Sequence, residues 1–271
     1  MGKVIAVFNQ KGGVGKTTTN VNLSASLGTL GKKILVLDLD PQGNTTSGYG
    51  INKNEVENTI YEIMLDGLHI KEAIISTEFE NIDVVPSATE LSGAEIELTS
   101  KTNREYILKN SIKAVIDEYD YIFIDTGAGI NKNVLAFIAC SEETIVITTP
   151  EPTSLTDAYS LIKATDHFKL TNTANVIVNR AFSIKDGEET YNKLKRAVEK
   201  FLTIKVNYLG SISEDRKLVE GVRAQVPFTI LHPKCDASKS IERISNKLIG
   251  NVSVENMGAE GLFKKLFSLF S

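Results

Sequence analysis

A glycine-rich stretch near the start of the chain carries the residue types best suited to bind phosphate. The β-branched run Val4–Phe8 leads through the turn Asn9–Gly15 into a helical pattern. Such a turn lets backbone N–H groups point into one anion-sized hollow at the positive end of the helix. Lys16 adds a cation for the β- and γ-phosphates, and the Thr17 hydroxyl is a candidate ligand for Mg²⁺. The predicted nucleotide-binding residues in this stretch are Lys11, Gly12, Gly13, Val14, Gly15, Lys16, Thr17 and Thr18.

The loop departs from the common phosphate-binding pattern G-x-x-x-x-G-K-[ST]. Gln10 stands where that pattern has its first glycine, and the loop instead reads K-G-G-V-G-K-T-T, with an additional lysine, Lys11. A surface turn that happens to hold glycines and a lysine is the alternative interpretation. An eight-residue match directly after a strand favours the phosphate site.

Two acidic residues follow strand patterns and are predicted to complete the site. Ile34–Leu39 leads to Asp40, and Tyr121–Ile124 leads to Asp125. Ligands of open parallel sheets bind beyond the carboxyl ends of the strands, so both carboxylates can face the phosphates. We expect Asp125 to hold Mg²⁺ through water and Asp40 to orient the attacking water, with the more buried Asp38 as a second candidate. Either residue could instead be a turn or helix N-cap residue.

The elements that position these residues form an alternating series of strands and helices. Short runs that are apolar throughout indicate parallel strands covered on both faces, and helical patterns lie between them. We predict an α/β fold with a doubly wound, mostly parallel sheet flanked by helices, in one domain over residues 1–249. The predicted strands are Val4–Phe8, Ile34–Leu39, Ile82–Val85, Tyr121–Ile124, Thr144–Thr148, Asn175–Val178 and Val206–Leu209. Helical patterns include Thr17–Leu30, Arg104–Glu118 and Glu188–Phe201.

The composition excludes several protein classes. Among 271 residues, 30 Lys and Arg face 34 Asp and Glu, and the net charge of −4 argues against a protein coated in nucleic acid. Cys140 and Cys235 form neither a disulfide framework nor a zinc cluster, as expected in a reducing cytosol. There is no apolar run of membrane-spanning length, and Gly12, Gly13 and Lys16 interrupt any signal peptide. We therefore expect a cytoplasmic chain.

The end of the chain has a different pattern. Residues 250–261 are small, polar and glycine-punctuated, which is typical of a tether. In residues 262–271, six Leu and Phe side chains fall within an arc of roughly 160° on a helix. This pattern predicts an amphipathic helix lying in a membrane surface, although a terminal helix packed on the domain is the alternative. The predicted membrane-binding residues are Leu262, Phe263, Lys264, Lys265, Leu266, Phe267, Leu269 and Phe270.

With K-G-G-V-G-K-T-T and the two acidic strand ends, the chain resembles the ParA/MinD family of deviant-Walker P-loop ATPases over essentially its whole length. The resemblance implies ATP and Mg²⁺ as ligands. It also implies an ATP-dependent homodimer in which Lys11 reaches the partner subunit's nucleotide. The dimer would adhere to a surface, and slow hydrolysis, stimulated by an activating protein partner, would release it.

The resemblance changes along the chain. Residues 1 to about 115 resemble the chromosomal ParA (Soj) branch, and residues from about Asp120 resemble the MinD/FlhG branch. By similarity, Glu151 would touch the ribose of the partner subunit's nucleotide, and Asn179 with Arg180 would recognise adenine. A turn residue at a strand end is the alternative for Asn179.

Two functions follow from this division. The first is a MinD/FlhG-like ATPase at the inner face of the cell membrane that positions the division site or a flagellum. The alternative is a chromosome or plasmid partition ATPase that binds nucleoid DNA non-specifically and is stimulated by a ParB-like partner. A metal-cluster enzyme of the related nitrogenase iron protein group is disfavoured, because Cys140 and Cys235 lack the spacing of bridging ligands.

Overall fold

The computed structural model describes residues 2–93, 104–129 and 132–250. These residues build one eight-stranded sheet with the strand order β3-β4-β2-β5-β1-β6-β7-β8. Every neighbouring pair is parallel except β3 and β4, which are antiparallel at one edge. The strands are β1 (Lys3–Phe8), β2 (Ile34–Leu39), β3 (Ile75–Ser76), β4 (Ile82–Val85), β5 (Tyr121–Thr126), β6 (Glu143–Thr148), β7 (Thr173–Ala181) and β8 (Lys205–Ser213).

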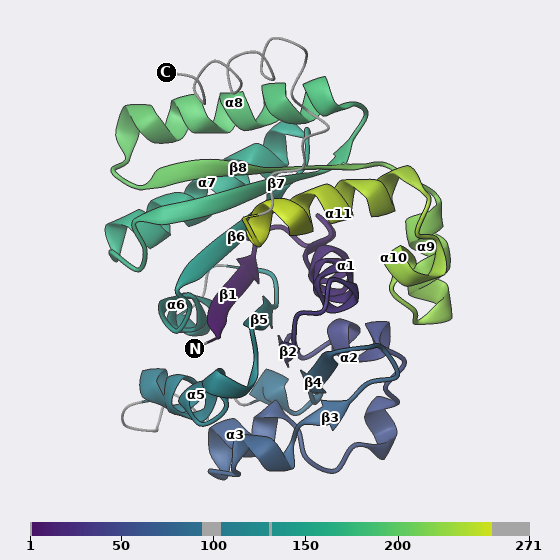
Figure 1. Cartoon of the computed structure of the whole chain (residues 1–271). Helices are drawn as coiled ribbons and strands as arrows, with labels where there is room; N and C mark the ends of the chain where they lie inside the picture. The colour runs from purple at the N-terminus through teal and green to yellow at the C-terminus, as the bar shows by residue number, and fades with distance from the viewer. Residues whose placement is uncertain (1, 94–103, 130–131, 251–271) are drawn as a thin grey trace, which may run out of the picture.

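Helices cover both faces of the sheet (Figure 1). Buried side chains of α1, α10 and α11 pack on one face, and those of α3, α5, α6, α7 and α8 pack on the other. The helices are α1 (Lys16–Thr29), α2 (Asn44–Gly48), α3 (Ile60–Leu65), α5 (Arg104–Lys113), α6 (Lys132–Ala139), α7 (Pro152–His167), α8 (Ile184–Phe201), α9 (Lys217–Ala224), α10 (Phe228–Leu231) and α11 (Asp236–Leu248), with short 3₁₀ turns at Lys53–Glu55, Ile70–Glu72 and Ile116–Glu118.

Strand β1 shows why the apolar runs are continuous. Val4, Ala6 and Phe8 lie in the core on one face, and Ile5 and Val7 lie in the core on the other. Successive side chains of a strand point to opposite faces, so a central strand that is covered on both faces has no polar positions. The predicted doubly wound, mostly parallel sheet is confirmed.

The predicted helix Arg104–Glu118 is wrong at its C-terminal end. Helix α5 ends at Lys113, and a separate 3₁₀ turn spans Ile116–Glu118. The carbonyl oxygen of Ile116 accepts a hydrogen bond from the N–H of Gly2 at 2.8 Å, and the Ile116 side chain is buried. This contact with the start of the chain turns the backbone toward β5, and periodicity within the segment could not reveal it.

The predicted helix Glu188–Phe201 is confirmed and is longer than expected. Helix α8 begins at Ile184, where the Ser183 side chain accepts a hydrogen bond from the N–H of Asp186. Serine is a favoured N-cap residue because its hydroxyl satisfies an otherwise unpaired N–H group. The two-residue strand β3 was not predicted.

The predicted tether and amphipathic helix lie almost wholly outside the described residues, which end at Gly250. Both therefore stay predictions. Of the helices in the described ranges, none has the length and apolar character needed to cross a membrane.

Candidate nucleotide-binding site

The phosphate loop joins β1 to α1, as predicted. Gly13 and Gly15 have φ angles of +76° and +92°, in the left-handed region that favours glycine. Gly15 occupies the N-cap position of α1, and no described side chain caps this helix. Its first N–H groups therefore stay open toward a ligand, at the end of the helix that attracts anions.

Lys16 lies at the base of this loop and is 7% exposed. Its Nζ donates a hydrogen bond of 3.2 Å to the carbonyl oxygen of Lys11, so the ammonium bends back over its own loop. Burial lowers the pKa of Lys16, and the charges of Asp125 and Asp40 act in the opposite direction. From this position the Lys16 ammonium can leave the carbonyl oxygen of Lys11 and bind the oxygens of a phosphate group.

Asp125 lies at the carboxyl end of β5 and combines with two hydroxyl groups. Its Oδ2 accepts hydrogen bonds from Thr17 Oγ1 at 2.9 Å and Thr45 Oγ1 at 2.6 Å. Its Oδ1 is buried and has no hydrogen-bond partner in the described part of the chain. Burial is the main cause that raises the pKa of Asp125 to about 6. Thr45 was not predicted from the sequence, although its place just after the Asp40 turn was a usable signal.

This donor set fits the implied Mg²⁺. A carboxylate with a free oxygen and a threonine hydroxyl are hard oxygen ligands, as Mg²⁺ prefers. No group of three or more His, Cys, Asp or Glu that could hold a metal ion lies in the described ranges. Mg²⁺ commonly binds to only one or two protein side chains and takes its other ligands from phosphate and water, so Asp125 and Thr17 would suffice.

Asp38 and Asp40 lie at the end of β2 and have different environments. Asp38 is fully buried and accepts hydrogen bonds from Thr46 N and Oγ1, at 2.8 and 2.7 Å. Burial, followed by the charge of Asp125, raises the pKa of Asp38 to about 7. Asp40 lines the cavity described next, and its Oδ1 accepts from the N–H of Gln42 at 3.0 Å. Asp40 is thus both a turn residue and a residue that faces the site, whereas Asp38 holds the start of α2.

A cavity of about 760 Å³ opens beside the loop. One wall comes from α9, α10 and the residues between them, which sequence reasoning did not identify. The buried side chain of Val14 lies in the core, so Val14 can serve a nucleotide only through its backbone. The lining consists of Gly12, Gly13, Gly15, Lys16, Thr17, Thr18, Val21, Asn22, Asp40, Gln42, Asn44, Ser47, Gly48, Ala128, Arg180, Gly221, Val222, Gln225, Val226 and Phe228.

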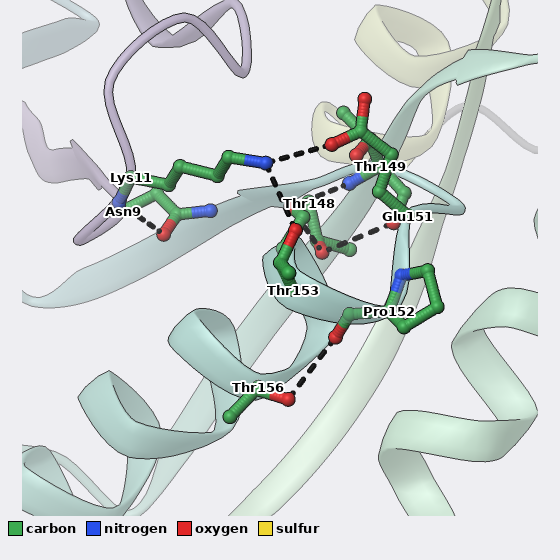
Figure 2. A network of polar contacts seen from close by, with 9 residues as sticks. Asn9, Lys11, Thr148, Thr149, Glu151, Pro152, Thr153 and Thr156 are labelled. Carbon is green, nitrogen blue, oxygen red and sulfur yellow. Dashed lines mark hydrogen bonds and ion pairs between the residues drawn. The ribbon is translucent and has the colours of Figure 1, made fainter.

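The additional lysine of the loop points away from this cavity. Figure 2 shows Lys11 extended toward the β6–α7 connection and the start of α7, where Nζ contacts Glu151 Oε2 at 2.7 Å and Thr153 Oγ1 at 3.0 Å. The hydrogen bond with Lys11 lowers the pKa of Glu151. Asn9 holds the backbone of Lys11 in place. Its side chain accepts a hydrogen bond from the N–H of Lys11 and donates one to the carbonyl oxygen of Ile147. The structure therefore brings Lys11 and Glu151 together on one chain.

The two residues predicted to recognise adenine, Asn179 and Arg180, lie in different environments. Arg180 lines the cavity, but Asn179 does not. The Asn179 amide donates to the carbonyl oxygen of Val14 at 2.8 Å and accepts from the N–H of Arg180 at 2.9 Å. A contact of Asn179 with adenine stays a prediction, and in this conformation the amide is already engaged with the loop.

Comparison with known proteins places these features in a family. A family model described as an AAA domain matches residues 2–178. The chain is 47% identical to the sporulation initiation inhibitor protein Soj of Bacillus subtilis over 146 residues, which are 54% of this chain and 58% of that relative. This alignment thus spans little more than half of the relative's length.

Two other similarities cover nearly the whole chain. The chromosome-partitioning ATPase Soj of Treponema pallidum is 32% identical over 256 residues, 92% of this chain and 98% of that protein. The septum site-determining protein MinD of Pyrococcus horikoshii, solved as a complex with Mg-ADP, is 26% identical and covers 94% of this chain and 100% of its own, with a TM-score of 0.76. The chain belongs to the ParA/MinD family of P-loop ATPases.

Proposed function

We propose that this protein is an ATP-hydrolysing switch whose ATP-bound form is a homodimer. The placement of Lys11 carries the proposal. Lys11 belongs to the phosphate loop, yet its ammonium lies outside the cavity on the exposed β6–α7 connection. From this position, once released by Glu151 and Thr153, the ammonium would contact the nucleotide of a second copy and not that of its own chain.

Hydrolysis would proceed by in-line attack of water on the γ-phosphorus. Asp40, at the cavity wall, would orient this water. Lys16 and the loop N–H groups would stabilise the charge that develops on the phosphate oxygens. Lys11 of the partner subunit would add a second cation from across the interface. The Mg-ADP in the solved MinD relative supports ATP and Mg²⁺ as the ligands.

Thr17 and Asp125 are the residues that would hold Mg²⁺. When bound, the ion would neutralise phosphate charge. The unpartnered Oδ1 of Asp125 supports this assignment, because a buried carboxylate oxygen ordinarily has a partner.

The dimer proposal is tested by the substitution Lys11→Ala. We expect the variant to bind ATP with an affinity close to that of the wild type, because the cavity on its own chain is intact. We also expect it to remain a monomer, because the cation that would reach the partner subunit's nucleotide is removed. Calorimetry measures the affinity, and light scattering during gel filtration measures the mass with ATP and with ADP. A stable ATP-dependent dimer without Lys11 would refute the contact between subunits.

The surface to which the dimer adheres is proposed to be an anionic membrane. The support is the sequence of residues 262–270, where six large apolar side chains accompany Lys264 and Lys265. One such segment would bind weakly, and two in a dimer would bind much more tightly through their effective concentration. ATP-dependent dimerisation would then control membrane binding, with positioning of the division site or a flagellum as the outcome.

Partition of DNA is the second candidate function. Its support is the similarity to Soj of T. pallidum, a chromosome-partitioning ATPase, over almost the full length of both chains. In this case the dimer would bind nucleoid DNA, and a ParB-like protein would stimulate hydrolysis.

Co-sedimentation with anionic liposomes distinguishes the two candidates. The full chain and a variant ending at Gly261 are each tested with ATP, ADP or no nucleotide, beside a parallel assay with non-specific duplex DNA. Pelleting with ATP that disappears on truncation is the expected result. Binding to DNA with ATP, without pelleting of liposomes in any state, would make partition the function.

A further inference from the structure

A buried amide at the end of β7 contacts the phosphate loop. Asn179 is 3% exposed, and its Nδ2 donates a hydrogen bond of 2.8 Å to the carbonyl oxygen of Val14. Its Oδ1 accepts from the backbone N–H of Arg180 at 2.9 Å. Because the two bonds use opposite ends of the amide, the side chain is held with its nitrogen toward the loop.

The loop is shaped to receive this amide. A Cβ atom at Gly15 would lie 2.1 Å from Nδ2 of Asn179, so any other residue at this position would displace the amide. The φ angle of Gly15, +92°, also favours glycine. Gly15 therefore makes room for Asn179 as well as for phosphate.

The contact sets the direction of an N–H group in the loop. Within a trans peptide unit, the C=O and N–H bonds point in opposite directions. The carbonyl of Val14 points at Asn179, so the N–H of Gly15, in the same peptide unit, points away from β7. Gly12, Gly13 and Gly15 line the cavity, so the backbone of this part of the loop borders the space that a phosphate would occupy. Without the amide, this peptide unit could rotate and turn its N–H away from a bound phosphate.

We propose that Asn179 is a positioning residue that holds the Val14–Gly15 peptide unit in its phosphate-binding orientation. The inference rests on the proposed function, because it requires that the loop binds ATP. It gives Asn179 a task that does not depend on the base of the nucleotide. The family resemblance implies an adenine contact instead, and the two roles predict different results.

The test compares Asn179→Ala and Asn179→Asp with the wild type and with Asn175→Ala. Asn175 lies on the same strand, and its amide contacts Glu143 and not the loop, so this variant is a matched control. Calorimetry with Mg²⁺ measures the affinity for ATP, GTP and inorganic tripolyphosphate, which has no base. Hydrogen exchange of the loop amides in the unliganded protein provides a readout that needs no ligand, and thermal unfolding checks that each variant is folded.

A positioning role predicts that both Asn179 variants lose roughly tenfold in affinity for all three ligands, with an unchanged ratio of ATP to GTP. The loop amides exchange faster in both variants, and Asn175→Ala behaves like the wild type. Loop exchange and tripolyphosphate affinity at the wild-type level, with only the preference for ATP lost, would overturn the inference. If the wild type bound neither ATP nor tripolyphosphate, the proposed function would fail instead.

Discussion

At the scale of single residues, the site depends on carboxylates that differ sharply in burial. Asp38 and Asp125 are both fully buried and are direct neighbours in the register of β2 and β5. Asp38 accepts hydrogen bonds inside the protein, while Asp125 keeps one oxygen without a partner in the described residues. Asp40, two residues after Asp38, faces the cavity. Their adjacency concentrates negative charge where a metal ion and a water molecule are needed.

The burial of Asp38 predicts a specific dependence of stability on pH. Its pKa of about 7 in the folded protein lies above the value of 3.8 expected for an exposed aspartate, so unfolding releases a proton between about pH 4 and 7. The contribution of Asp38 to the free energy of unfolding therefore decreases as the pH rises through this window. Asp38→Asn should reduce the loss of stability between pH 5 and pH 8.

Urea denaturation at the two pH values, without nucleotide or Mg²⁺, measures this difference. Asp66→Asn, at an exposed position, is the control and should keep the wild-type dependence. An Asp38→Asn protein whose stability declined with pH as much as that of the wild type would contradict the assignment.

At the scale of elements, the segments that follow the carboxyl ends of β1 and β6 contact each other through the side chain of Lys11. The β1–α1 loop carries Lys11, the β6–α7 connection carries Glu151, and the first turn of α7 carries Thr153 (Figure 2). In the proposed dimer, both Lys11 and Glu151 face the partner subunit's nucleotide, so their mutual contact has to break. We therefore expect the contact within one chain to compete with dimer formation.

Weakening this contact should favour the dimer. Thr153→Val removes one of the two oxygens that hold the ammonium, and we expect the ATP-dependent dimer to become roughly two- to fivefold tighter, because an exposed contact of this kind is weak. Sedimentation velocity with ATP measures the dissociation constant. Thr156→Val is the matched control, since among the described residues the Thr156 hydroxyl bonds only to the carbonyl oxygen of Pro152. A looser dimer in Thr153→Val would show that the hydroxyl contributes to the interface.

At the scale of the whole molecule, hydrolysis is proposed to end the surface-bound state, so a variant that cannot hydrolyse ATP should remain a dimer. Asp40→Ala removes only the carboxylate. The carbonyl oxygen of Asp40 still accepts hydrogen bonds from Gly43 and Ser87, which preserve the turn. We expect ATP binding and dimer formation to persist and turnover to fall at least about a hundredfold.

Phosphate release measures the turnover of this variant, and light scattering measures the fraction of dimer over time. The wild type should return to the monomer as ATP is consumed, and Asp40→Ala should not. Wild-type turnover by the variant would remove Asp40 from its proposed role.

The sequence alone determined the fold class, and it located the strand–loop–helix segment to which the phosphate site is assigned. Both can be recognised in short stretches of chain. A strand that is apolar throughout indicates a covered parallel strand, and the glycines and lysines between Asn9 and Thr18 indicate a loop that leads into a helix. The carboxyl ends of parallel strands meet at one edge, so Asp40 and Asp125 could also be assigned without coordinates.

Only the tertiary structure decided which groups are already engaged with one another. Lys11 and Glu151 are 140 positions apart, and Asn179 and Val14 are 165 positions apart. The wall from α9 and α10, the contact of Thr45 with Asp125 and the end of α5 likewise arise between distant segments. No local pattern encodes such contacts, because they form only when folding brings segments that are distant in the sequence together.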